Sequence, residues 1–325
     1  MALNFSVMSR SIGSVVLGLI LLAGCQATPR VPAPAAQAPG RPAAGQAVFA
    51  SDDAAAKDLI DAAKARDKAG VDRILGPVAK ELGSGDAVAD ANGFESFATH
   101  AAEGMRVEKR GAALSVLHIG AADWPFPIPL VKSAEGTWFF DTAAGKQEIL
   151  ARRVGRNELE AINVCRAYVV AQREYASVPR DGTDVLKYAQ HVLSHPGTKD
   201  GLYWEATAGE EQSPFGPLMA QAEAEGYMPK KGSGRQPYHG YYYRILTKQG
   251  PDAPNGRYDY VINGSMIGGF AMIAWPAEYG NSGVMTFIVS HQGKVYEKDL
   301  GEGTDGAAPA IREYNPDVTW KLVKE

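Results

Sequence analysis

The densest group of side chains able to do chemistry is Tyr-His-Gly-Tyr-Tyr-Tyr-Arg at residues 238–244. Tyrosine rings beside a guanidinium can stack on a sugar, a peptide or another planar ligand, and the imidazole of His239 can transfer a proton. The alternative is a sheet strand whose tyrosines pack on both faces while Arg244 covers one of them, and the strand propensity of aromatic residues favours it. The candidate ligand or partner surface here consists of Tyr238, His239, Tyr241 and Arg244.

A second aromatic group is Asp-Trp-Pro-Phe-Pro at residues 123–127. Proline restricts the backbone, so the segment is stiff. Trp124 and Phe126 can form a binding lip or anchor a protein interface, where aromatic residues carry much of the binding energy. The segment can equally be a rigid plug that closes one part of the molecule. Trp124 and Phe126 complete the candidate surface.

His191 and His195 are four residues apart, a spacing that places two imidazoles on one face of a helix, toward a metal ion. A metal site needs a third ligand and supporting groups, and Pro196 is expected to end a helix at this point. The acidic residues between 297 and 305 lack the pattern of a calcium loop. We therefore predict no metal site and no cofactor.

The sequence contains no glycine-rich phosphate loop, no His-Glu-x-x-His zinc helix and no paired-cysteine motif. Gly-Asn-Ser-Gly at 280–283 comes nearest to a nucleophile elbow and is better explained as a turn between strands. We predict no catalytic residue. The alternative is an envelope hydrolase acting on wall or carbohydrate material, in which His239, Arg244 and a nearby carboxylate share a deep pocket.

The composition is that of a globular protein, with 45% hydrophobic and 22% charged residues. The net charge of -4 argues against nucleic acid as a partner, because phosphate binding needs a basic surface. Of the two cysteines, Cys165 lies on the apolar stripe of an expected helix. We expect it to be buried and unreactive, since buried cysteine usually behaves as a small hydrophobe.

Residues 1–24 have the layout of a secretory signal, with Arg10 before an apolar run at 12–22 that is shorter than the roughly 20 residues of a membrane span. The sequence Leu-Ala-Gly-Cys at 22–25 resembles the lipobox of bacterial lipoproteins. That resemblance implies lipidation of Cys25 and cleavage before it, so the membrane is a partner through the anchor. Gln26 favours delivery to the outer membrane, facing the periplasm. The alternatives are a plain signal peptide and an uncleaved membrane helix.

Residues 25–47 are rich in proline, alanine and glycine and show no periodicity, which predicts a disordered tether. The body after it is expected to be α+β and to form two domains, at 48–153 and 154–325, each with a helix packed on a curved antiparallel sheet.

The first expected domain has helical periodicity followed, after a polar segment, by alternating runs. Its elements are helices at 51–66 and 71–82, two strands within 105–118, and a hairpin of strands at 128–132 and 137–140. This order resembles the nuclear-transport-factor-two-like cone.

The second expected domain begins with a helix whose start is marked by the capping-box pair Asn157 and Glu160 and which reaches Tyr175. Asn263-Gly264 is a strong hairpin signal. The other elements are helices at 185–193 and 217–225 and strands at 241–247, 257–262, 270–275, 284–289 and 295–298. The order resembles the periplasmic domains of type IV pilins and pseudopilins. Fiber assembly does not transfer, because the helix here is amphipathic and internal.

Most of the body resembles a bacterial family catalogued as domain of unknown function 2950. The segments that carry the resemblance are 122–131, 138–145, 156–159, 238–242 and 283–289. The family implies no activity and no catalytic residues. We therefore expect an uncharacterised cell-envelope lipoprotein that acts without catalysis, as a binding or assembly factor with a possible envelope protein partner. A purely structural spacer is a further alternative.

Overall fold

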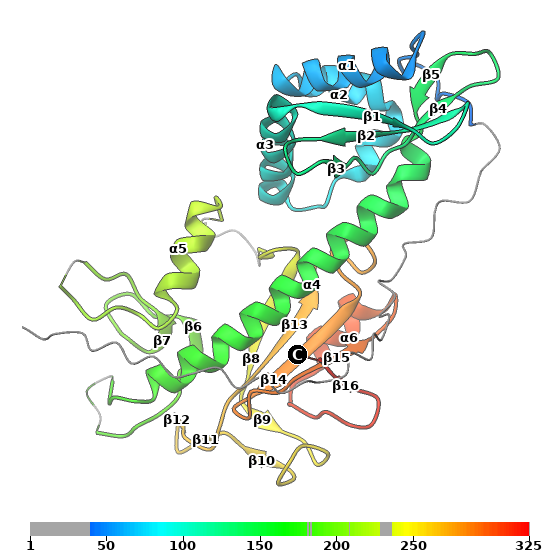
Figure 1. Cartoon of the computed structure of the whole chain (residues 1–325). Helices are drawn as coiled ribbons and strands as arrows, with labels where there is room; N and C mark the ends of the chain where they lie inside the picture. The colour runs from blue at the N-terminus through cyan, green and yellow to red at the C-terminus, as the bar shows by residue number, and fades with distance from the viewer. Residues whose placement is uncertain (1–39, 181, 183, 208, 228–235, 325) are drawn as a thin grey trace, which may run out of the picture. The chain divides into compact units, whose positions relative to one another are not determined.

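The computed structural model describes residues 40–180, 182, 184–207, 209–227 and 236–324. The expected signal segment, Cys25 and most of the tether at 25–47 lie outside these residues. All described residues belong to one compact unit, Pro39–Glu325. Helices combine with sheets that are antiparallel except for one pair of short strands, which confirms the α+β class (Figure 1).

The N-terminal elements begin with helices. They are α1 (Asp52–Lys64), α2 (Lys68–Leu75), a short 3-10 helix η1 (Pro77–Leu82) and α3 (Ala87–Glu103). Ser51 caps α1, since its side chain accepts a hydrogen bond from the Ala54 amide. The segment expected to be merely polar is α3, whose alanine-rich sequence buries only Ala98 and Ala101 completely and so carries a weak apolar pattern.

The first sheet has the strand order β1-β2-β4-β5, with β3 also paired to β2. Its strands are β1 (Met105–Lys109), β2 (Leu114–Ile119), β3 (Trp124–Pro125), β4 (Leu130–Lys132) and β5 (Trp138–Phe140). Both expected strand pairs, β1 with β2 and β4 with β5, are antiparallel as predicted. The sheet and α1 enclose an apolar core that includes Leu59, Ile60, Leu117, Leu130 and Phe140.

Helix α4 (Thr142–Tyr175) is 34 residues long, so the predicted start at Asn157 is wrong. The cap is Asp141, whose side chain accepts a hydrogen bond from the Ala144 amide. The Asn157 side chain instead donates to the Ser282 carbonyl at 2.9 Å. The capping-box pattern is therefore present, but it does not cap a helix. The expected boundary between residues 153 and 154 falls inside α4, which is continuous there.

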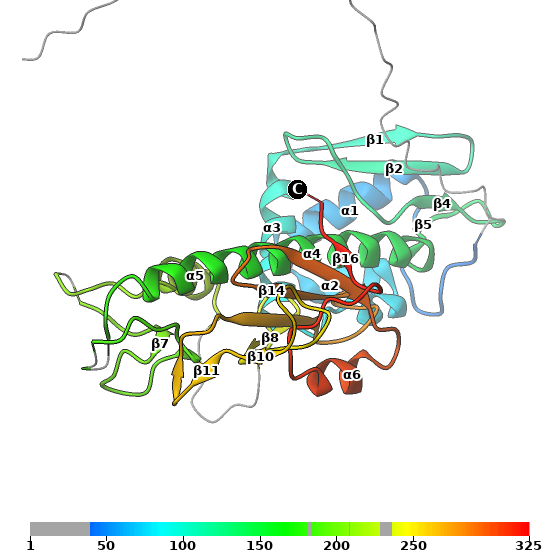
Figure 2. The same cartoon turned by 90° about the horizontal axis from the view of Figure 1, so that it is seen from below.

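The main sheet has the order β16-β15-β14-β13-β8 and is antiparallel throughout. Its strands are β8 (Tyr241–Leu246), β13 (Ala271–Pro276), β14 (Met285–Ser290), β15 (Val295–Asp299) and β16 (Lys321–Leu322). Helix α4 lies on one face and α6 (Thr304–Ala310) on the other (Figures 1 and 2). Because both faces are covered, every residue of β13 is buried.

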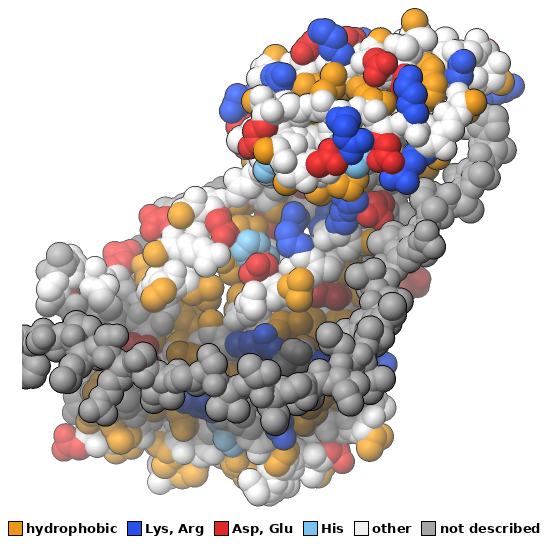
Figure 3. Space-filling model, viewed as in Figure 1, with side chains coloured by type: hydrophobic (Ala, Val, Ile, Leu, Met, Phe, Trp, Pro, Cys, Tyr) orange, Lys and Arg blue, Asp and Glu red, His pale blue; other side chains and the backbone are white. Residues whose placement is uncertain are grey.

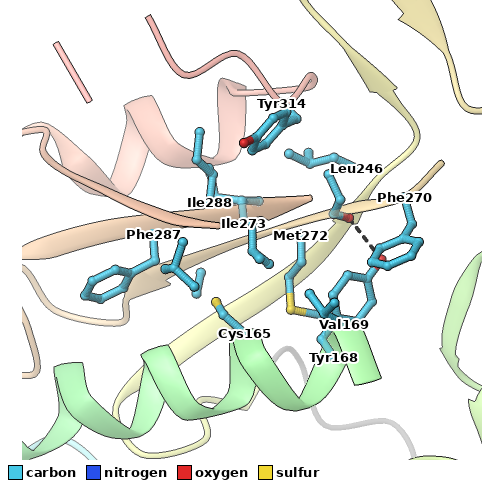
Figure 4. Packing of buried hydrophobic residues seen from close by; sticks show 14 of the residues in the cluster. Cys165, Tyr168, Val169, Leu246, Phe270, Met272, Ile273, Phe287, Ile288 and Tyr314 are labelled. Carbon is cyan, nitrogen blue, oxygen red and sulfur yellow. Dashed lines mark hydrogen bonds between the residues drawn. The ribbon is translucent and has the colours of Figure 1, made fainter. Parts of the chain in front are cut away.

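The core between α4 and this sheet contains Cys165, Tyr168, Val169, Met272 and Phe287 (Figure 4). The Tyr168 hydroxyl donates to the Ala271 carbonyl at 3.1 Å, which satisfies the one polar atom that this ring brings into the core. Cys165 is fully buried as predicted, and burial raises the pKa of its thiol to about 12, so the thiolate form is suppressed.

Shorter elements surround the main sheet. They are β6 (His191–Leu193) and β7 (Gly201–Tyr203), which are parallel, α5 (Gly216–Ala224), β9 (Lys248–Gln249), β10 (Tyr258–Asp259), β11 (Val261–Ile262) and β12 (Ser265–Met266). The helix expected at 217–225 is confirmed as α5. The helix expected at 185–193 is wrong, because residues 185–187 form no helix and 191–193 form β6.

The hairpin predicted at Asn263-Gly264 is confirmed, since β11 and β12 pair across it and both turn residues have positive φ, +50° and +80°. The strand expected at 257–262 is broken into β10 and β11, neither of which joins the main sheet.

Candidate functional site

The predicted surface at residues 238–244 begins with a tight turn into β8. Tyr238 and Tyr241 exchange two backbone hydrogen bonds of 2.9 and 3.1 Å, and His239 and Gly240 between them have φ of +48° and +72°. A Cβ at Gly240 would lie 2.6 Å from Nδ2 of Asn157. Glycine is therefore required here, both for the backbone conformation and for the close approach of α4.

The alternation of β8 separates side chains that the sequence placed in one cluster. Arg244 points to the α6 side, where its guanidinium lies 5.6 Å from the Trp275 ring and donates to the carbonyls of Pro309 and Ile311. Arg244 therefore ties the end of α6 to the sheet, as the strand interpretation expected.

Tyr241 belongs to the core on the α4 side. It is fully buried, and its hydroxyl donates to the Met285 carbonyl at 3.0 Å. A Cβ at Gly283 would lie 2.1 Å from that hydroxyl, so the backbone of the neighbouring segment passes directly over the ring. The fit leaves Tyr241 closed to solvent, and it does not contribute to an open surface.

His239 lies beside an acid. Its Nε2 is 2.9 Å from Oε2 of Glu225, although the two atoms are not aligned for a hydrogen bond, and its ring packs against Tyr238 at 4.3 Å and Tyr227 at 5.5 Å between centroids. The pair has the composition that the hydrolase alternative requires. However, neither His239 nor Glu225 lines the neighbouring cavity described next, and Arg244 faces α6.

An apolar pocket of about 210 Å³ lies beside the tyrosine strand. Its walls come from α4, β6, α5, the turn before β8, β8 itself and β13. The lining residues are Val164, Val192, Phe215, Leu218, Met219, Ala222, Tyr227, Gln236, Pro237, Tyr238, Tyr243 and Met272. Two members of the predicted tyrosine cluster, Tyr238 and Tyr243, therefore line a real cavity.

Tyr243, a residue of the pocket wall, has an unusual hydroxyl group. It is buried and has no hydrogen-bond partner among the described residues. Burial raises the pKa of Tyr243 well above its ordinary value, so the phenol stays neutral and can both donate and accept a hydrogen bond. By contrast, the Tyr227 hydroxyl on the same wall donates to Oδ2 of Asp86 at 2.7 Å.

The two aromatic residues of the segment 123–127 have different environments. Trp124 is 43% exposed and carries the guanidinium of Arg152 at 5.1 Å over its ring. Phe126 packs inward on Phe97 and Phe140, with ring centroids 5.6 and 5.9 Å apart. Phe126 thus packs against the first core and is partly buried, whereas Trp124 is largely presented to solvent.

His118, which the sequence analysis did not single out, is held between two acidic residues. Its Nε2 lies 2.9 Å from Oε2 of Glu108, and its Nδ1 lies 3.0 Å from the Asp123 carbonyl oxygen. The β1–β2 register brings His118 opposite Arg106, which bonds Asp123 at 2.6 Å. Both ring nitrogens have partners, so the arrangement is a cross-strand clamp in this structure.

Sequence reasoning missed most of the pocket because its walls come from segments far apart in the chain. One local signal was available. Phe215, Leu218, Met219 and Ala222 have the spacing of one helix face, which marks an apolar side of α5 that must pack against something. The sequence does not show that the described residues cover this side only in part.

Comparison with known proteins gives one assignment. None of the helices within the described residues is long and apolar enough to cross a membrane. No curated protein and no solved structure matches the chain, so the cone-like and pilin-like resemblances stay predictions. The family model described as protein of unknown function (DUF2950) matches residues 46–323, and the chain therefore belongs to the DUF2950 family.

Proposed function

We propose that this protein is a cell-envelope lipoprotein that acts without catalysis, as a binding or assembly factor. It is anchored through a lipid on Cys25 and recognises an envelope protein through the apolar pocket. The observation that carries the binding proposal is an apolar cavity with Tyr243 in its wall, a residue whose buried hydroxyl has no described partner.

The proposed location in the cell envelope is supported by the N-terminal segment of the sequence. The signal layout and the Leu-Ala-Gly-Cys sequence at 22–25 support export and lipidation, with delivery to the outer membrane on its periplasmic side. The family match begins at residue 46, where the proline- and alanine-rich segment ends. A tether of that composition suits a body that must reach a partner away from the lipid surface.

The pocket selects a mostly apolar group. Its walls offer almost no partner to a charge, and burying an unpaired charge is costly. A buried hydroxyl without a partner costs about 1–3 kcal/mol, which a ligand recovers if it brings one hydrogen-bonding atom to Tyr243. The preferred occupant is therefore an apolar group with a single polar atom.

The size of the pocket favours a side chain over a free metabolite. At about 210 Å³ it is smaller than the roughly 300–1,000 Å³ of most small-molecule pockets. An aromatic side chain of a partner protein fills such a cavity as an interface anchor, and tyrosine or tryptophan supplies the polar atom. Over the N-terminal elements in Figure 3, basic and acidic side chains are interspersed, which suits a protein surface better than a polyanion.

The test is photo-crosslinking of the full lipoprotein in intact cells, with a benzophenone side chain at Leu218 in the pocket wall. The matched position is Leu159, which is 64% exposed on α4. We expect a discrete protein adduct from position 218 and none above background from 159. Ala222→Phe should fill the pocket and remove the adduct, whereas Ala220→Phe, on an exposed position of the same helix, should leave it.

Two outcomes contradict the binding proposal: equal crosslinking from both positions, or an adduct that survives Ala222→Phe. Detection of a small molecule bound to the purified protein by native mass spectrometry would also contradict the proposal. The occupant of the pocket would then be a metabolite and not a protein side chain.

The anchor is tested separately, by mass spectrometry of the mature N-terminal peptide. We expect an acylated Cys25 at the new N-terminus, and release of the Cys25→Ala form from the membrane fraction. An unmodified Cys25 in the membrane-bound wild type would overturn the lipoprotein assignment and leave the pocket proposal untouched.

A further inference from the structure

The loop between β6 and β7 brings His191, His195 and Asp200 together. One ligand atom from each residue lies within 4.8 Å of those of the other two. The sequence supplied only the two histidines, on a helix that does not form. The loop replaces that helix and adds a carboxylate as a third potential ligand.

The backbone of this loop is closely constrained. The Ser194 amide donates to the Tyr203 carbonyl at 2.8 Å, and the Gly201 amide donates to Oγ of Ser194 at 3.0 Å. A Cβ at Gly201 would lie 2.6 Å from the carbonyl carbon of Leu193, so only glycine permits this approach of the two strands. The backbone positions of the three residues are thus set by the strand pair, which favours preorganised binding.

Asp200 orients His195. Its Oδ2 lies 2.6 Å from Nδ1 of His195, and its Oδ1 accepts hydrogen bonds from the His195 amide at 2.9 Å and from Oγ1 of Thr198 at 2.7 Å. These three contacts fix the carboxylate of Asp200 beside the imidazole of His195.

The hydrogen bonds of Asp200 to His195 and Thr198 do not explain why a histidine is present at position 191. The His191 ring lies edge-on to the ring of His195, with centroids 5.1 Å apart. Both histidines are exposed, whereas Val192 between His191 and Leu193 lines the apolar pocket on the other face of β6. The packing of β6 therefore does not require an imidazole at position 191.

We propose that His191, His195 and Asp200 bind one divalent transition-metal cation of the zinc type. Two imidazoles and one carboxylate suit zinc, copper, nickel and cobalt, whereas calcium and magnesium prefer oxygen ligands alone. The cation replaces the hydrogen between Nδ1 of His195 and Oδ2 of Asp200, this proton is released to solvent, and water completes the coordination. The site lies outside the apolar pocket and does not depend on the function proposed for it.

The experiment is calorimetric titration of the full-length protein in detergent, without a histidine tag, with zinc chloride. We expect about one zinc per chain. His191→Ala and His195→Ala should each weaken binding at least tenfold, and Asp200→Asn by about 10- to 100-fold. The matched control is His100→Ala, which removes an exposed histidine bonded to the Ser96 carbonyl on α3. It should bind zinc like the wild type.

Cobalt substitution gives an independent readout, since visible absorption bands of the bound ion report ligation and should disappear in His191→Ala. That variant removes no hydrogen bond of the loop described above, so it should keep the wild-type circular dichroism spectrum. Absence of zinc binding to the wild type at about 100 μM, or wild-type affinity in His191→Ala, would overturn the proposal.

Discussion

Two segments of this molecule are both rich in aromatic residues but pack in opposite ways. Around Phe126, the rings of Phe97 and Phe140 fill the space and the side chain acts as a plug. Around Tyr243, the rings and aliphatic walls leave about 210 Å³ open, and a hydroxyl faces no described partner. The apolar surface of the first region is covered by the protein's own side chains and stabilises the fold. In the second region, part of the apolar surface is free to contact another molecule.

The difference teaches that aromatic density alone does not identify a binding surface. The useful signs are an unfilled volume and a polar atom without a partner, because both lower the stability of the free protein and both are removed when a ligand binds. The comparison is therefore open to measurements of stability as well as of binding.

The largest effect is expected from Phe126→Ala. Truncating this ring leaves a cavity between Phe97 and Phe140 and should lower the free energy of unfolding by about 3 kcal/mol. Denaturant unfolding measures it, and Trp124→Ala is the control, with an expected cost of about 1 kcal/mol for a ring 43% exposed under Arg152. Equal costs for the two variants would break the comparison.

Tyr241→Phe comes next. The hydroxyl removed donates to the Met285 carbonyl, which then lacks this donor, so we expect a loss of about 1.5 kcal/mol by the same unfolding measurement. A neutral result would mean that this hydrogen bond adds nothing to the stability of the sheet.

Tyr243→Phe should have the opposite sign. It removes a buried hydroxyl that has no described partner, so the free protein should gain up to about 1 kcal/mol while the crosslinked adduct at position 218 weakens. Tyr241 and Tyr243 lie on the same face of one strand, which makes them matched controls for each other. Destabilisation by Tyr243→Phe would show that the hydroxyl is satisfied and would remove the basis of the pocket proposal.

The smallest expected effect is that of Asp52 in the N-terminal core on the pH dependence of stability. Burial acts to raise the pKa of Asp52, but hydrogen bonds from Ser115 and the Asp53 amide, together with Lys109, outweigh it and lower that pKa. Because the folded pKa is below the unfolded value of about 3.9, the stabilisation is complete above that pH and is lost as the pH falls through the folded pKa.

The measurement is the free energy of unfolding at pH 6 and pH 3 for the wild type and Asp52→Asn. The stability advantage of the wild type should shrink at pH 3. An advantage that is unchanged or larger at pH 3 would contradict the sign of the shift.

The sequence predicted those elements whose signals are local. Asn263-Gly264 forms its hairpin because both residues tolerate positive φ, and β13 with β14 appears as two apolar runs because the strands are covered on both faces. The strand interpretation also predicted that Arg244 covers one face of the sheet. Side-chain alternation along β8 directs it to the face that carries α6.

The remainder depended on contacts across the chain. Helix α3 gives only a weak apolar pattern because its buried residues are alanines. Asn157 has the spacing of a helix cap, but its partner, the Ser282 carbonyl, is 125 residues away in the sequence. Similarly, the pocket exists only because segments far apart in the chain meet, and no window of sequence shows this. His191, His195 and Asp200 are close in sequence, but they meet through a short strand and a turn where the pattern predicts a helix.

Helix α4 also governs how the molecule loses its structure. Ile149, in its first half, packs on the N-terminal core, and Cys165, in its second half, packs on the main sheet. A 34-residue helix of this kind is held by the surfaces it covers more than by its own propensity. Melting of either core therefore frays the helix toward the other, so the two cores should unfold in one cooperative transition, with coincident curves from probes placed in each.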